Sequence, residues 1–161
     1  MSQTKVSRDV TINGEKFALL VETEHQGIAV STAVHRQQHE HRQGGVRFVR
    51  QGTREELGHL ARGMTEKCAA SRVPLDGLKC LAITPNGEPA GSEEKVALLA
   101  EHSRVVIQED AGVIFGPDMG WPEEVLSEVA TFPGLLDHLT GLTARVEGES
   151  SGRFLCWILR R

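Results

Sequence analysis

The sequence predicts an α/β domain with one mixed sheet flanked by helices. Short apolar runs typical of strands alternate along the chain with segments of helical periodicity, which is the order of elements in α/β folds. The length of 161 residues fits one ordinary domain with a core of its own. The apolar fraction of 39% and the charged fraction of 25% are close to those of an average globular protein. Residues 1–161 are therefore expected to form a single domain.

The first part of the chain is expected to supply three strands. A buried strand at residues 17–21 follows the turn at Asn13-Gly14, and no element is assigned before that turn. A second strand is expected at residues 28–34. The polar stretch 35–43 then leads to Gly44-Gly45 and to a short third strand at residues 46–50.

The clearest helix begins after Thr53. Thr53 is a suitable N-cap, and Glu56 three residues later completes a capping box. The helix should end near Arg72, because the following Val73-Pro74 disfavours helical backbone. Apolar residues recur through it at the helical spacing, at Leu57, Leu60, Ala61, Met64 and Cys68.

The second half continues the alternation. A strand is expected at residues 78–83, followed by a turn at residues 85–87. A helix should run from Ser92 to near Arg104. Residues 105–107 and 113–115 resemble sheet or sheet-edge segments.

The C-terminal region has weaker patterns. Pro122 suits the first turn of another helix, and an amphipathic stretch follows at residues 135–142. The apolar segment 154–159 could be a strand or helix that closes the core, or an anchor in a dimer contact.

Composition excludes several classes of protein. The formal net charge of −4 gives no reason to expect nucleic acid as a partner. No apolar run approaches the roughly 18 residues of a membrane span, and the N-terminus lacks the apolar stretch of a signal peptide. The three cysteines are odd in number and lack metal-type spacing, which suits a reducing cytoplasm. A cytoplasmic protein without membrane contact is expected.

Three histidines, His35, His39 and His41, lie close together in the polar stretch. A zinc site needs three or four ligands in a fixed geometry, and only His35 and His39 would share a helix face. We expect a solvated loop and no metal. If this loop folds over a pocket, one of the histidines could carry a proton near neutral pH.

Four stretches occur in the order in which they occur in one known family. They are Gly-Gly-Val-Arg-Phe at residues 44–48, Met-Thr-Glu-Lys at 64–67, Val-Pro-Leu-Asp-Gly-Leu-Lys at 73–79, and Gly-Pro-Asp-Met-Gly at 116–120. Over roughly residues 14–152 the chain thus resembles the N-terminal substrate-binding and dimerisation domain of the glutamate/leucine/phenylalanine/valine dehydrogenases. The resemblance implies the fold of that domain and a homodimer or larger homo-oligomer.

The resemblance also implies roles for individual residues. Lys67 would bind a substrate carboxylate, Lys79 would polarise a carbonyl or a water, and Asp118 would carry a proton. The glycines Gly44 and Gly45 would line the substrate pocket.

The residues by themselves leave alternatives open. Lys67 lies near the apolar stripe of its helix, where a lysine can also snorkel to solvent. Lys79 shares a strand face with apolar residues, although a lysine on an edge strand can be a protective device. Asp118 follows Gly-Pro, a common position for a turn-forming aspartate.

The sequence departs from the family where three glycines normally precede the catalytic lysine. Here Asp76-Gly77-Leu78 occupies that place. Asp76 and Leu78 are expected to add charge and bulk where substrate and nicotinamide would approach, and Asp76 is expected to modify Lys79 by holding it protonated. Ordinary hydride chemistry is therefore in doubt.

A second departure lies before the paired glycines, at Gln43. Glutamate-specific members have a lysine there and branched-chain enzymes an apolar residue. Gln43 therefore predicts contact with a polar, uncharged side chain on the ligand.

The nucleotide-binding half of the family is missing from this sequence. No Gly-x-Gly-x-x-Gly follows a strand, so no cofactor is expected and the chain should not act alone as an NAD-dependent dehydrogenase. The preferred hypothesis is a non-redox enzyme that acts by lysine and aspartate acid–base chemistry on an amino acid or a 2-oxo acid-like molecule with a carboxylate. The alternatives are a metabolite-binding or regulatory module and half of a split dehydrogenase. The altered glycines argue against the split enzyme.

Overall fold

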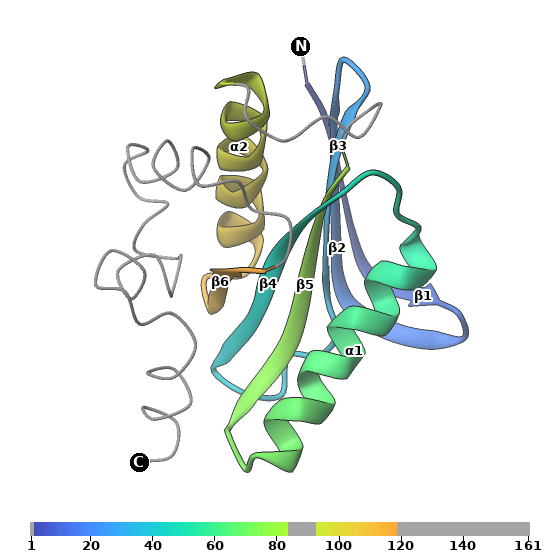
Figure 1. The fold of residues 1–161 in the computed structure, drawn as a ribbon. Helices are drawn as coiled ribbons and strands as arrows, with labels where there is room; N and C mark the ends of the chain where they lie inside the picture. Colours follow the sequence, from blue (N-terminus) through green and yellow to red (C-terminus); the bar gives the residue numbers. More distant parts are fainter. Residues whose placement is uncertain (1, 84–92, 119–161) are drawn as a thin grey trace.

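The computed structural model describes residues 2–83 and 93–118, which form a six-stranded sheet with two helices (Figure 1). The elements are β1 (Gln3–Ile12), β2 (Glu15–His25), β3 (Ile28–Val34), β4 (His41–Val49), α1 (Arg54–Ala70), β5 (Leu75–Ile83), α2 (Glu93–Glu109) and β6 (Val113–Pro117). The predicted α/β class with a mixed sheet is confirmed.

The strands lie in the order β1-β2-β3-β5-β4-β6. The first four of these strands pair antiparallel, whereas β4 runs parallel to both β5 and β6. Among the described strands, β6 is therefore one edge of the sheet and β1 is the other. The central position of β4 between β5 and β6 brings together motifs that are far apart in the sequence.

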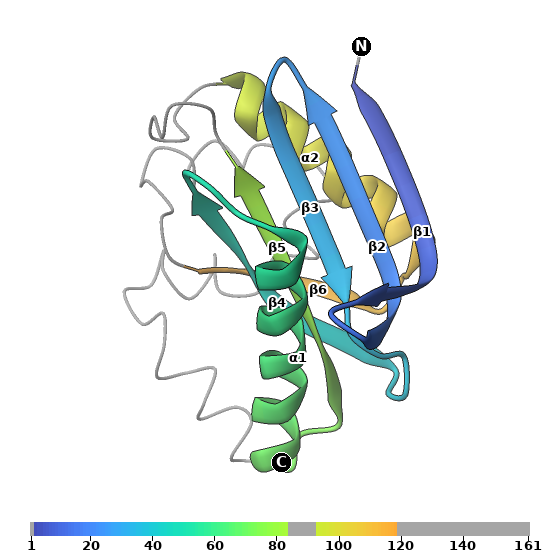
Figure 2. The ribbon, with the colours of Figure 1, turned by 90° about the vertical axis from the view of Figure 1, so that its right-hand side faces the viewer.

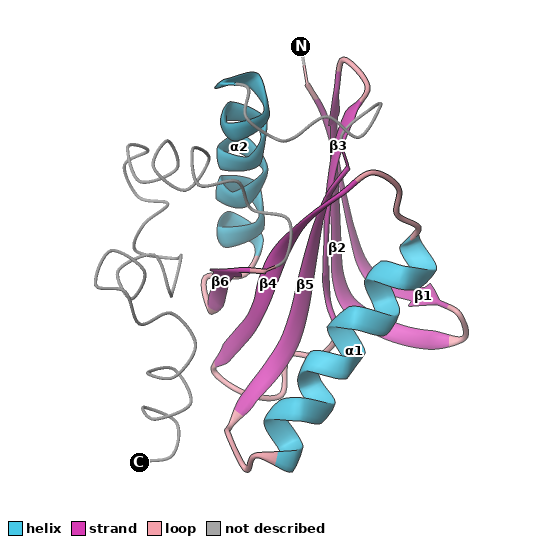
Figure 3. Ribbon diagram, in the orientation of Figure 1, coloured by secondary structure: helices cyan, strands magenta, loops and turns pink. Residues whose placement is uncertain are grey.

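The two helices cover opposite faces of the sheet (Figures 2 and 3). Strand side chains alternate between the two faces. On β2, Leu19 and Val21 pack in the core that contains Leu99 of α2, whereas Leu20 packs with Leu57 of α1. We call these two sides of the sheet the α2 face and the α1 face.

Alternation also divides β5 between the faces. Leu78, Cys80 and Ala82 belong to the core on the α2 face. Leu81 and Ile83 pack on the α1 face, so Lys79, two residues before Leu81, projects to the α1 face as well.

Most of the expected elements in the described residues are confirmed. The strands predicted at 17–21, 28–34, 46–50, 78–83 and 113–115 lie within or overlap β2, β3, β4, β5 and β6. Thr53 caps α1, since its Oγ1 accepts a hydrogen bond from the Glu56 backbone N–H at 3.1 Å. No helix of the described residues is long and apolar enough to cross a membrane.

The prediction of a sheet segment at residues 105–107 is wrong, because these residues belong to helix α2, which continues to Glu109. Val106 is fully buried in the core with Leu99, and Val105 packs against the same core. Helical packing against the sheet here outweighs the strand preference of β-branched residues.

Strand β1 has no counterpart among the predicted elements. It is an edge strand whose side chains are mostly exposed and polar, so it shows no apolar alternation. The predictions for the turn at 85–87, for the segment beginning at Pro122 and for residues 135–142 and 154–159 lie outside the described residues.

Candidate functional site

Lys79 is buried, with 5% of its surface exposed, although it carries an amine. Its ammonium forms an ion pair and hydrogen bond with Asp118 Oδ2. The two residues belong to motifs 39 positions apart in the chain. The structure thus brings together the two residues that the sequence assigned to acid–base chemistry.

The arrangement depends on strand β4, which lies between β5, the strand that contains Lys79, and β6, the strand that Asp118 directly follows. Gly45 of β4 pairs with Gly116 of β6, and the β4–β5 register sets Gly45 level with Lys79. The Asp118 backbone N–H donates to Val46 O at 3.1 Å. The side chain of Asp118 can then reach over β4 toward Lys79.

Gly45 leaves the space through which Asp118 passes. A Cβ atom at Gly45 would lie 2.6 Å from the Asp118 Cβ, closer than side-chain carbons approach. The missing side chain of Gly45 therefore permits the Lys79–Asp118 pair.

Gly44 has a different task. A Cβ atom at Gly44 would lie 1.8 Å from the carbonyl oxygen of Leu78. Gly44 is thus required for the close passage of β4 along β5.

Arg47 is a third charged residue of the site, which the sequence interpretation did not single out. Its Nε donates to Asp118 Oδ2 at 3.0 Å. Arg47 lies two residues after Gly45 and so projects from the same face of β4. Arg47 belongs to the Gly-Gly-Val-Arg-Phe stretch, and this is the sequence feature from which it could have been identified as a site residue.

The surroundings alter the proton affinity of Lys79. Burial lowers the pKa of Lys79 most strongly, and the charges of Arg47 and Lys67 lower it further. The contact with Asp118 raises the pKa but does not restore the ordinary value. Lys79 therefore gives up its proton more readily than an exposed lysine does.

Lys67 lies in the last turn of α1 and is exposed. It is close enough for its charge to lower the pKa of Lys79. Within residues 2–83 and 93–118 no ion pair of the Lys67 ammonium is recorded. The exposed ammonium of Lys67 thus adds positive charge near Lys79.

Gln43 lies on β4, two residues before Gly45, and is 9% exposed. It pairs with Gly77 on one side and with Ile114 on the other. Alternation places it on the α1 face with Gly45 and Arg47. The amide of Gln43 therefore projects from the same face of β4 as Arg47.

The side chains of Asp76 and Leu78, which were expected to add charge and bulk near the site, project to the face of β5 opposite Lys79. Both side chains are fully buried, and Leu78 belongs to the core on the α2 face. Asp76 lies two residues before Leu78 on β5 and also projects to that face, because every second residue of a strand shares a face. Neither side chain reaches the space beside Lys79.

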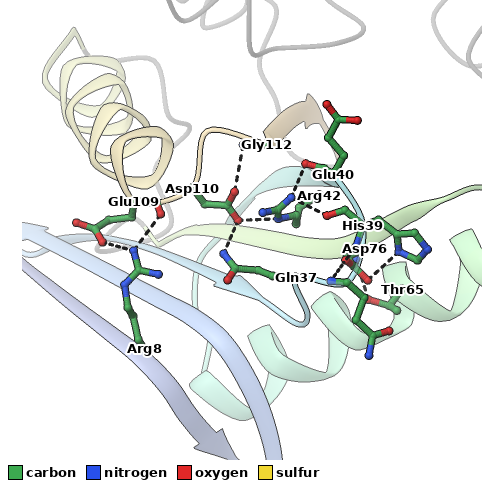
Figure 4. Close-up of polar contacts among 12 residues, drawn as sticks. Arg8, Gln37, His39, Glu40, Arg42, Thr65, Asp76, Glu109, Asp110 and Gly112 are labelled. Atoms are coloured by element: carbon green, nitrogen blue, oxygen red, sulfur yellow. Dashed lines mark hydrogen bonds and ion pairs between the residues drawn. The ribbon is translucent and has the colours of Figure 1, made fainter.

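Asp76 instead binds the loop that precedes β4 (Figure 4). Its Oδ2 accepts from the backbone N–H groups of Gln38 at 2.6 Å and His39 at 2.7 Å, and its Oδ1 contacts His39 Nδ1 at 3.2 Å. Burial would raise the pKa of Asp76, but the hydrogen bonds from His39 and Gln38 hold it below the usual value.

A second buried carboxylate, that of Asp110, holds the same loop from the other side (Figure 4). Its Oδ2 accepts from Arg42 Nε at 2.7 Å and from Gln37 Nε2 at 2.9 Å. The loop is therefore attached both to β5 and to the end of α2.

The three histidines do not face a common point. His35 is buried, so the expectation of a solvated loop is wrong for this residue. Its Nδ1 contacts Thr65 Oγ1 at 3.0 Å and its Nε2 contacts Glu15 Oε1 at 2.9 Å. His39 contacts Asp76, while His41 is exposed at the start of β4.

The family described as Glu/Leu/Phe/Val dehydrogenase, dimerisation domain, matches residues 15–130. The fold is similar to L-tryptophan dehydrogenase from Nostoc punctiforme, with a TM-score of 0.53 and 21% identity over 70% of this chain and 32% of that one. It is also similar to the hetero-hexameric glutamate dehydrogenase from Thermus thermophilus, with a TM-score of 0.50 and 20% identity over 93% of this chain and 32% of that one.

The chain thus spans about a third of the length of these solved structures. No curated protein sequence matches it.

Proposed function

Since the chain belongs to the family of the Glu/Leu/Phe/Val dehydrogenase dimerisation domain, we propose that it binds an amino acid or a 2-oxo acid-like molecule and performs acid–base chemistry on it. The observation that supports this most directly is the buried ion pair between Lys79 and Asp118. Buried titratable groups with altered proton affinity are frequent in catalytic sites.

Each charged group has a role that its position allows. The exposed ammonium of Lys67 binds the carboxylate of the ligand. Lys79 polarises the ligand carbonyl or imine, or takes a proton as the neutral amine that its lowered pKa favours. Asp118 carries the proton to or from the ligand nitrogen or oxygen.

This chemistry needs no hydride acceptor. Imine hydrolysis, tautomerisation and hydration all require polarisation of a carbonyl or imine and proton transfers to and from the ligand, with no change of oxidation state. We therefore propose a non-redox reaction that these side chains perform without a cofactor.

A second candidate is the substrate half of a dehydrogenase whose nucleotide domain is supplied elsewhere. The position of Asp76 and Leu78 on the α2 face favours this candidate, because their bulk does not obstruct an approach to Lys79.

The proposal includes a homo-oligomer in a reducing, cytoplasmic compartment. The matched family is described as a dimerisation domain. Cys68 and Cys80 are both buried, free thiols, which suits such a compartment.

A ligand screen tests the proposal. Thermal shift of the purified chain with amino acids and 2-oxo acids should find stabilising ligands that contain a carboxylate, and NMR should then detect their turnover. Lys67→Met should weaken binding of such a ligand at least tenfold, because the carboxylate loses its cation. Lys79→Met should retain binding but abolish turnover.

Lys16→Met removes an exposed lysine of β2 and is the matched control, with binding and turnover unchanged. If no compound of this class stabilises the protein, or if Lys79→Met turns over as fast as wild type, the proposal fails. Turnover that appears only with a dinucleotide and an added nucleotide-binding domain would favour the second candidate.

A further inference from the structure

We propose that Arg47 is a positioning residue that keeps the Asp118 carboxylate in place when Lys79 releases it to act on a ligand. The inference rests on the proposed function of the site and adds a residue to which no role has been assigned. It starts from one shared atom, since Asp118 Oδ2 accepts both from Lys79 and from Arg47 Nε.

The two cations differ in whether they keep their charge and their contact with Asp118. Lys79 is buried and its pKa is lowered, so it can become a neutral amine, and it must also turn toward the ligand that it polarises. Either event weakens its attraction for Asp118. Arginine, unlike lysine, does not act as a proton donor or acceptor in proteins. The contact of Arg47 with Asp118 therefore persists through a reaction cycle.

The geometry lets Arg47 hold Asp118 against the sheet. The Asp118 backbone is bound to Val46 O, and the next residue of β4, Arg47, supplies the side-chain contact. Both side chains are only about one-fifth exposed, at 20% for Arg47 and 22% for Asp118. Partial burial reduces the screening of the pair by water. The carboxylate is thus attached to β4 at both its backbone and its side chain.

Arg47 also acts on Lys79 through its charge. The guanidinium is among the groups that lower the pKa of Lys79. Arg47 therefore has two effects, and both favour proton transfer at the site. It holds the proton carrier, and it helps Lys79 to give up its proton.

Replacing Lys79 by methionine imitates the step in which the lysine leaves Asp118. Carbodiimide coupling to an added amine, mapped by mass spectrometry, measures how accessible the Asp118 carboxylate is. In Lys79→Met, Arg47 should keep Asp118 protected. In the double variant Lys79→Met/Arg47→Met, coupling at Asp118 should be at least tenfold faster.

Several controls separate positioning from general loosening. The buried Asp76 and Asp110 should react equally slowly in both variants. Lys79→Met/Arg50→Met removes an exposed arginine of the same segment and should leave Asp118 protected. Arg47→Lys in the Lys79→Met background should restore part of the protection, because it keeps the charge but loses the planar donor. Equal coupling rates at Asp118 with and without Arg47 would overturn the inference.

A second measurement does not depend on the Lys79 variant. NMR titration of chain labelled at lysine Cε should show that Arg47→Met raises the pKa of Lys79, whereas Arg50→Met leaves it unchanged. An unchanged Lys79 titration in Arg47→Met would contradict the electrostatic part. Both experiments use the protein without ligand, so a failed ligand screen and a failed Arg47 experiment are distinguishable.

Discussion

Among single residues, Gly45 has the most specific structural task, because Asp118 occupies the space that a side chain would need. In Gly45→Ala the new Cβ, 2.6 Å from the Asp118 Cβ, must displace Asp118 from Lys79. The buried Lys79 then loses its partner, which should cost about 3–5 kcal/mol of unfolding free energy. Urea unfolding measures this loss.

Gly63→Ala is the matched control for Gly45→Ala. Gly63 lies inside α1, and a Cβ there would meet no atom within 4 Å. The substitution should add about 0.5–1 kcal/mol, because alanine favours helix over glycine. Equal stability of the two alanine variants would show that Gly45 does not protect the space of Asp118.

His102 of α2 makes the stability of the protein depend on pH. It is fully buried between Thr23 Oγ1 at 2.9 Å from Nδ1 and Thr32 Oγ1 at 2.8 Å from Nε2. Burial lowers the pKa of His102 to about 3. In the unfolded chain the pKa of His102 is about 6.5. Between these two pKa values the unfolded state therefore binds a proton at His102 that the folded state does not bind.

Stability should therefore fall as the pH drops from 7 toward 3. Between pH 7 and pH 5 the His102 contribution is about 2 kcal/mol. Chemical unfolding of wild type and His102→Gln at the two pH values measures it, and the variant should lose about 2 kcal/mol less than wild type over this interval. The same pH dependence in both proteins would refute the assignment.

At the level of secondary-structure elements, one small cluster attaches α1 to β5. Gly77 lies against the helix, since a Cβ there would be 2.2 Å from Ala61 O. Thr65 Oγ1 accepts from the Gly77 backbone N–H at 2.7 Å and contacts His35 Nδ1 at 3.0 Å. This contact sets the position of the helix from which Lys67 projects.

Thr65→Val keeps the shape of the side chain but removes both polar contacts. The Gly77 N–H and the His35 ring nitrogen then lose their partner, which should cost about 2–4 kcal/mol. Thr65→Ser keeps the hydroxyl and should lose about 1 kcal/mol. Guanidinium unfolding of the two variants distinguishes them, and a valine variant as stable as the serine variant would contradict the role of the hydroxyl.

For the molecule as a whole, β1 presents the longer edge of the sheet. It pairs only with β2 among the described strands, and Val6 is a large hydrophobic side chain exposed at 39%. An open edge has unpaired N–H and C=O groups that can bind a second copy of the strand. We therefore expect a homodimer or larger symmetric assembly that uses β1.

Light scattering at micromolar concentration should give a mass above that of the single 17.6 kDa chain. Val6→Lys should shift the assembly toward monomer, because an edge lysine opposes strand addition. His59→Lys, at an exposed position of α1, is the control that should leave the mass unchanged. A monomeric wild type would exclude this assembly.

The sequence by itself determined the fold class, most elements and the residues of the Lys79–Asp118 pair. Strand 28–34 and the helix capped by Thr53 follow from patterns within a few neighbouring residues, which is where periodicity and capping act. The motifs around Lys79 and Asp118 could be identified because they resemble those of one family.

Only the tertiary structure decided which of these residues meet. The order β5-β4-β6 sets Arg47 beside Asp118, and the pleat of β5 turns Asp76 away from Lys79 although only three positions separate them. Edge strand β1 and the last turns of α2 likewise depend on partners distant in the chain. The physical reason is that strand pairing and the choice of sheet face are set by contacts between distant segments, which local patterns do not contain.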